Sequence, residues 1–225
     1  MISYNNDPEF KKKAVEAAIR HREMDMLMPD TYGKYTAHGF KGCSIGCDAF
    51  DITGNIPNSP HKVTAKYFGF PEWLERLRDS IFEGLERADR VNWHVDIKKA
   101  IPIGMNDADF DQVKKDFLIW LMEQNIKVVE GLNIERVLKG ITLSAIHGVI
   151  EALEIGEGLE EAKNAAMAAS EAVAGSEVGR AVRAANYAMV TVTAASATSA
   201  ARAANYKKQS DKLIELFESY KAQKS

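Results

Sequence analysis

The chain has 225 residues, a formal net charge of −3 at pH 7, and 46% hydrophobic against 27% charged residues. This length and apolar content suffice for one substantial core or two small ones and exclude wholesale disorder. The small net charge excludes a global attraction to nucleic acid or to an anionic membrane, so we expect neither as a partner. Two cysteines are too few for the disulfide framework of a secreted domain.

The first residues, MISYNNDPEF, lack a basic segment followed by an apolar stretch. No apolar run approaches the roughly 18 residues that a membrane-spanning helix needs. We therefore expect a soluble protein of the cytoplasm with no membrane partner.

Helical periodicity dominates the chain up to about residue 155. Asp7 and Pro8 form a helix start, with Asp7 as N-cap, and the apolar pattern continues until Pro29 ends the helix. Apolar residues spaced three and four apart predict further helices, at 71–86, 92–100, 107–130 and 133–154. No segment shows the period-two alternation of strands. The fold is therefore predicted to be all-α, a helical bundle.

Residues 29–61 interrupt this pattern with several glycines and prolines and no sustained period. We expect an ordered loop rich in glycine and cysteine, and long loops of this kind tend to carry function. His38 and His61 belong to it. Outside the loop, His21 lies on an apolar helix face as a core histidine, and His94 is expected in a solvent-facing pair or in a pocket.

The C-terminal part differs in composition, with 18 alanines between residues 162 and 204 and no proline there. Alanine has the highest helix propensity, so we expect a long helical hairpin. We divide the chain into a helical N-terminal body, 1–155, and an alanine-rich helical region, 156–225. A helix face made of alanine buries little area, so apolar residues such as Met189 and Val192 would stay exposed within one chain. Since contiguous apolar surface is seldom left in water, we expect a homodimer through these helices.

The sequence GCSIGC, residues 42–47, holds both cysteines. As nucleophiles, Cys43 or Cys47 would need a depressed pKa and a nearby base, for which His38 and His61 are candidates. The same four residues would form a Cys2His2 metal site, although the C-x3-C spacing differs from the C-x2-C of structural zinc sites.

Anion binding is a third chemistry for this segment. Glycines let backbone N–H groups converge, and a helix start would aim its positive end at the same place. The ligand-binding residues would then be Lys41, Gly42, Cys43, Ser44, Gly46 and Cys47. The structural alternative is a tight turn, because free cysteine behaves as a small buried hydrophobe and glycine allows close packing.

Four stretches occur in a fixed order along the chain: GCSIGC at 42–47, FGFPEWLERLRDSIFEGL at 68–85, AIPIGMNDADFDQVKKDFLIWLM at 100–122, and an alanine-rich stretch that closes with ANYKKQSDKLIELF at 204–217. Over roughly residues 20–218 this order resembles a group of bacteriophage and bacterial proteins of unknown function. The resemblance implies a phage or prophage origin and a bacterial host cell, and it implies no activity.

No complete catalytic motif is present, and packing helices dominate the composition. We therefore predict a non-enzymatic binding protein of phage type, which docks a host protein or a small anionic ligand and for which counter-defence is a suitable role. We expect no cofactor and no metal. The alternative is a cysteine-dependent enzyme, or a protein that binds a small molecule or a metal, centred on the Gly-Cys-x-x-Gly-Cys loop.

Overall fold

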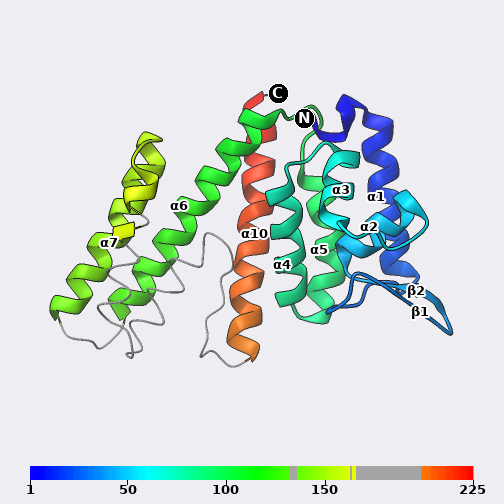
Figure 1. Ribbon diagram of the computed structural model, residues 1–225, viewed down its shortest axis with the longest axis horizontal. Helices are drawn as coiled ribbons and strands as arrows, with labels where there is room; N and C mark the ends of the chain where they lie inside the picture. Colours follow the sequence, from blue (N-terminus) through cyan, green and yellow to red (C-terminus); the bar gives the residue numbers. More distant parts are fainter. Residues whose placement is uncertain (132–135, 163, 166–198, 225) are drawn as a thin grey trace. The chain divides into compact units, whose positions relative to one another are not determined.

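The computed structural model describes residues 1–131, 136–162, 164–165 and 199–224 (Figure 1). The chain forms two compact units. Unit 1 comprises residues 1–113 and 203–225, and unit 2 comprises 114–202. This division does not coincide with the boundary at 155/156 that the alanine content suggested, because the end of the chain belongs with the first hundred residues.

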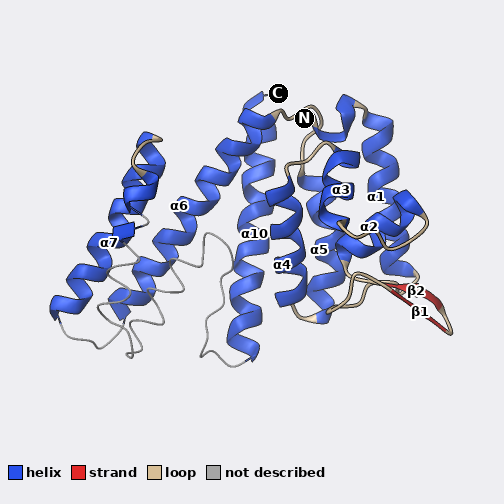
Figure 2. Ribbon diagram, in the orientation of Figure 1, coloured by secondary structure: helices blue, strands red, loops and turns tan. Residues whose placement is uncertain are grey.

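Unit 1 is built from helices and one small hairpin (Figure 2). Its elements are η1 (Ser3–Asn6), α1 (Pro8–Glu23), β1 (Lys34–Thr36), β2 (Gly39–Lys41), α2 (Ser44–Thr53), α3 (Pro60–Phe68), α4 (Glu72–Gly84), α5 (Arg87–Ala100), the start of α6 (Asp107–Gly131) and most of α10 (Ser199–Lys224). In this unit α1 packs against α5, α2 against α3, and α4 against α5. The prediction of an all-α protein is confirmed.

A buried aromatic cluster joins the two ends of the chain in unit 1. The ring of Tyr4 lies 5.1 Å from that of Phe70, which lies 6.0 Å from Phe110. Phe110, near the start of α6, in turn contacts Phe217 of α10 at 6.2 Å. Each edge-on aromatic pair adds about 0.5–1.5 kcal/mol to the burial of its rings. These contacts explain why 203–225 belongs to unit 1.

The first helix starts where the sequence predicted and ends earlier. The backbone N–H of Glu9 donates to Asp7 Oδ1 at 2.8 Å, which confirms the N-cap. The helix ends at Glu23, before the predicted stop at Pro29, because Asp25 adopts a left-handed conformation with φ of 50°. Leu27 then pairs with Gly42 in an isolated bridge, so the last apolar residues of the predicted helix pack as extended chain.

Residues 29–61 are more regular than the predicted loop. They contain the antiparallel hairpin β1–β2, in which Tyr35 pairs with Phe40, and they contain all of α2. Phe40 stacks on Phe50 of α2 at 3.9 Å between ring centroids. The strands have three residues each, too few for a period-two pattern to be recognised.

The later helices follow the predicted pattern with shifted ends. Helix α5 begins at Arg87, ahead of the predicted start at 92, and α6 begins at Asp107 as predicted. The predicted start of the next helix at 133 and the alanine-rich residues 166–198 lie outside the described residues. The helical hairpin and the homodimer interface predicted there therefore stay predictions.

In unit 2, the rest of α6 pairs with α7 (Arg136–Ile155). Lys115 Nζ donates to the carbonyl of Glu154 and Lys139 Nζ to the carbonyl of Glu130, both at 2.9 Å, so the two helices run antiparallel. Phe117 and Val149 are among the residues they bury. Across the described part of the whole chain, no helix combines the length and the apolar character that crossing a bilayer requires.

Candidate functional site

The GCSIGC segment leads from β2 into α2, and several of its backbone N–H groups are paired within the protein. Gly42 N donates to the carbonyl of Met26 at 3.0 Å, and Cys43 N donates to that of Thr31 at 2.7 Å. Gly46 N donates to Cys43 Sγ at 3.3 Å, so Cys43 serves as the N-cap of α2. These N–H groups point at protein acceptors, which favours the structural turn among the alternatives for this segment.

Close packing explains the glycines of the same segment. A Cβ atom at Gly46 would overlap the carbonyl oxygen of Tyr32, and one at Gly42 would meet the same oxygen. Lys41, at the end of β2, pairs with Asp25 at 2.7 Å. Gly42, Cys43, Ser44, Gly46 and Cys47 are all buried. Ligand binding by these six residues stays a prediction.

The two cysteines are free thiols in buried surroundings. Burial, reinforced by the nearby Asp79 carboxylate, raises the pKa of Cys43 far above its usual range. Burial and the charge of Asp48 raise the pKa of Cys47 to about 12. Both are therefore neutral thiols at physiological pH, which disfavours a thiolate nucleophile.

The structure brings together only some of the residues predicted as catalytic or metal-binding. His61 Nε2 lies 3.0 Å from Asp79 Oδ2. Ligand atoms of Cys43, Asp79 and Glu83 lie within 4.8 Å of one another, so one carboxylate neighbours both Cys43 and His61. His38 is exposed at the end of the β1–β2 hairpin, apart from this group.

The most unusual feature of unit 1 is a group of charged side chains that are completely buried, which the sequence analysis missed. Asp48 of α2 lies at its centre, 2% exposed. One carboxylate oxygen, Oδ1, accepts a short hydrogen bond from Lys98 Nζ of α5, and the other accepts from Arg78 Nη2 of α4 at 3.2 Å. Lys98 and Arg78 are themselves 0% exposed.

A second carboxylate balances this group. Arg78 Nη1 donates to both oxygens of Glu75, at 2.7 and 2.9 Å, and Glu75 also accepts from Thr64 Oγ1 at 3.0 Å. Two buried carboxylates thus face two buried cations, so charges that would each cost several kcal/mol alone are paired. We call Asp48, Glu75, Arg78 and Lys98 the buried charged centre.

Two buried histidines adjoin the centre. His21 Nδ1 of α1 lies 3.0 Å from His94 Nε2 of α5, and their rings stack at 5.3 Å. The other nitrogen of His21, Nε2, lies 2.9 Å from Asp51 Oδ2, which also accepts from Arg20 at 2.5 Å. The core position expected for His21 is confirmed. His94 is 0% exposed, which excludes the solvent-facing pair, one of the two places expected for it.

Burial and the charges of the centre shift the pKa values of its groups in opposing directions. Burial alone would raise the pKa of Asp48, but the charges of Lys98 and Arg78 outweigh it and keep the pKa of that carboxyl well below its usual range. Burial lowers the pKa of Lys98, against the pull of Asp48. Burial also lowers the pKa of His94 well below its usual value, so this imidazole is neutral. Such perturbed groups are typical of functional sites.

The centre borders a small cavity of about 100 Å³. Its walls are mostly apolar residues of α1 and α3, and its charged groups are Lys13, Asp48, Asp51 and Lys98. A cavity of this size admits a few water molecules or an ion. The buried centre is therefore within reach of small solutes.

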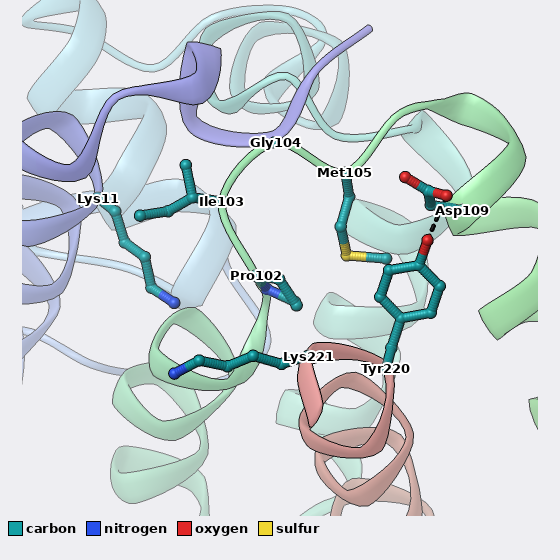
Figure 3. A pocket seen from close by; sticks show the side chains of 8 residues that line it. All are labelled: Lys11, Pro102, Ile103, Gly104, Met105, Asp109, Tyr220 and Lys221. Atoms are coloured by element: carbon teal, nitrogen blue, oxygen red, sulfur yellow. Dashed lines mark hydrogen bonds between the residues drawn. The ribbon is translucent and has the colours of Figure 1, made fainter. Parts of the chain in front are cut away.

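A larger pocket of about 310 Å³ lies elsewhere in unit 1, where α1 and α10 meet the turn between α5 and α6 (Figure 3). The amino groups of Lys11 and Lys221 point to the same side of this pocket. At the other side, Tyr220 donates a short hydrogen bond to Asp109. Pro102, Ile103 and Met105 are the apolar residues that line it. We call it the lysine pocket.

The amino group of Lys11 is partly buried at the end of α5. Its Nζ donates to the carbonyls of Lys99 and Ile101 at 2.7 and 2.6 Å, where α5 ends. Burial lowers the pKa of Lys11 to about 8, and the charge of Lys221 adds a smaller contribution in the same direction. A negative charge bound beside this amino group would favour its protonated form.

Comparisons with protein-family models, with curated proteins and with solved structures gave no match.

The state of the cysteines can be tested by alkylation. Because both thiols are buried and protonated, we expect iodoacetamide at neutral pH to label Cys43 and Cys47 slowly in the native protein and rapidly after denaturation. Mass spectrometry of the labelled peptides measures this. Rapid native labelling of one cysteine would contradict the structural role and would favour the cysteine-dependent enzyme.

Because His94 is buried, the free energy of unfolding should depend on pH. Its pKa is lower in the folded protein than in the unfolded chain, where it is about 6.5, so below that pH the unfolded state binds one more proton. The free energy of unfolding should fall by about 1.4 kcal/mol for each pH unit below about 6.5 through this group alone. Denaturant titrations with chelator at several pH values should show a shallower slope for His94→Gln. The exposed control His38→Gln should keep the wild-type slope, and equal slopes in all three proteins would contradict the assignment.

Proposed function

We propose that the protein is a binding protein for a small organic anion, which it holds in the lysine pocket. The observation that carries this proposal is the convergence of the Lys11 and Lys221 amino groups on one concave site. Two ammonium groups held close together repel each other, and an anion between them replaces the repulsion with two attractions. The lowered pKa of Lys11 supports the presence of that repulsion.

The walls of the pocket favour a ligand with both a charged and an apolar part. Ile103 lines it near Lys11 and Met105 lines it near Tyr220, so an aliphatic or aromatic body would be buried there (Figure 3). Its volume of about 310 Å³ lies at the small end of the range for ligand pockets, about 300–1,000 Å³. A monocarboxylate or a phosphate monoester of modest size suits both properties.

The other parts of the expected function stay predictions. A protein partner and a homodimer were expected through the alanine-rich residues, of which 166–198 lie outside the described part. A phage or prophage origin and a role in counter-defence depend on the resemblance of the sequence stretches quoted above. The small anionic ligand is the part of the expectation that the described side chains support, at a place other than the GCSIGC segment.

Anion binding can be measured by calorimetry with octanoate and inorganic phosphate as probes. We expect octanoate to bind more tightly than phosphate, because it adds apolar contact, and octanol to bind more weakly than octanoate. Lys221→Gln should weaken octanoate binding about tenfold, the loss of about 1.4 kcal/mol for one charge-assisted contact. The affinity should also fall as the pH rises through about 8, where Lys11 loses its proton.

Lys12→Gln is the matched control, since Lys12 neighbours Lys11 on α1 and its side chain is 63% exposed. It should leave the affinity for octanoate unchanged. Lys221 is the better test position, because Lys11 also holds the end of α5. Equal binding of octanoate by wild type, Lys221→Gln and Lys12→Gln, or no binding to wild type, would contradict the proposal.

A further inference from the structure

Three ligand-type atoms from three helices converge beside the buried charged centre. His21 Nδ1 of α1 lies 3.9 Å from Asp48 Oδ1 of α2, and His94 Nε2 of α5 lies 3.8 Å from the same oxygen. The two nitrogens are 3.0 Å apart. All three side chains are buried, with exposures of 0 to 2%. Only a small ion fits among atoms this close.

The spacing matches metal coordination. A circle through three points separated by 3.0, 3.8 and 3.9 Å has a radius of about 2.1 Å, and metal ions bind imidazole nitrogen and carboxylate oxygen at about 2.0–2.2 Å. We propose that His21, Asp48 and His94 bind a divalent transition-metal ion of the zinc or iron(II) class. Two imidazoles and one carboxylate are a donor set that suits these ions.

Asp51 prepares His21 for this role. An ionised carboxylate only accepts hydrogen bonds, so His21 donates its Nε2 proton to Asp51 at 2.9 Å. Nδ1 of the same ring, the nitrogen that would bind the metal, faces Asp48 and His94. A carboxylate that holds the far nitrogen of a ligand histidine recurs around metal ions and raises the basicity of the ligand. Arg20, 2.5 Å from Asp51, fixes this carboxylate in turn.

Lys98 supplies the positive charge that a metal ion would replace. Its ammonium group contacts the same Asp48 oxygen that would bind the metal. A dication bound at this oxygen would displace the ammonium group, so Lys98 and the metal ion compete for one carboxylate oxygen. The cavity of about 100 Å³, which Asp48, Asp51 and Lys98 border, offers a path for the ion.

Cobalt(II) tests the site directly, because its visible absorption changes when imidazole and carboxylate replace water. Full-length protein freed of metal by chelation should bind one equivalent of Co²⁺ with a new visible band, and Zn²⁺ should displace it. His94→Gln should abolish the band. Lys98→Met, which removes the competing cation, should bind Co²⁺ more tightly than wild type, and bound metal should raise its melting temperature.

Asp51→Asn keeps the test valid if the buried variants fold poorly, since Asp51 is 30% exposed. It should weaken Co²⁺ binding about 10- to 100-fold, the usual effect of removing such a supporting carboxylate. His38→Gln, at the exposed hairpin, is the control for surface binding and should bind as wild type does. No band in wild type, or a band that is lost in His38→Gln and retained in Asp51→Asn, would overturn the proposal.

Discussion

The buried Asp48 carboxylate is the constraint on which the arrangement of unit 1 depends. It sits in α2 and must be paired there, because an isolated ionised carboxylate costs several kcal/mol in the interior. Its partners come from two other helices, Arg78 on α4 and Lys98 on α5, and the two histidines beside it come from α1 and α5. Since both cations are also buried, α2, α4 and α5 cannot shift relative to one another without leaving a charge unpaired.

The pairing of α1 with α5 connects this centre to the lysine pocket. Near the start of α1, the amino group of Lys11 donates to the carbonyl of Ile101, just after α5. Near the end of α1, His21 contacts His94 of α5. The buried aromatic rings of Phe110 and Phe217 bring α10, and with it Lys221, to the same unit. Both proposed sites thus depend on one helix pair, and neither involves a reactive cysteine.

The sequence predicted the helices well because their apolar residues recur at three and four spacings over many turns. It missed the hairpin, whose strands are too short for a pattern, and α2, whose glycines resembled a loop. It also missed the buried charged centre. Asp48 stands between the buried residues Cys47 and Ala49, and Arg78 lies on the apolar helix face of Leu74 and Ile81. A charged residue on an apolar helix face was therefore the sequence signal for a buried charge. Which charge pairs with which depends on contacts between residues far apart in the chain, and a single sequence does not show them.

The role of Asp48 is tested most directly by the free energy of unfolding of Asp48→Asn, measured with chelator present and compared with Asp211→Asn. Asp211 pairs with Lys207 at the surface, and exposed pairs contribute at most about 1 kcal/mol. Removing Asp48 leaves Lys98 buried without its partner, so we expect a loss of about 3–5 kcal/mol, part of which Lys98→Met should restore in the double variant. If Asp48→Asn costs no more than Asp211→Asn, the buried charged centre does not organise this fold.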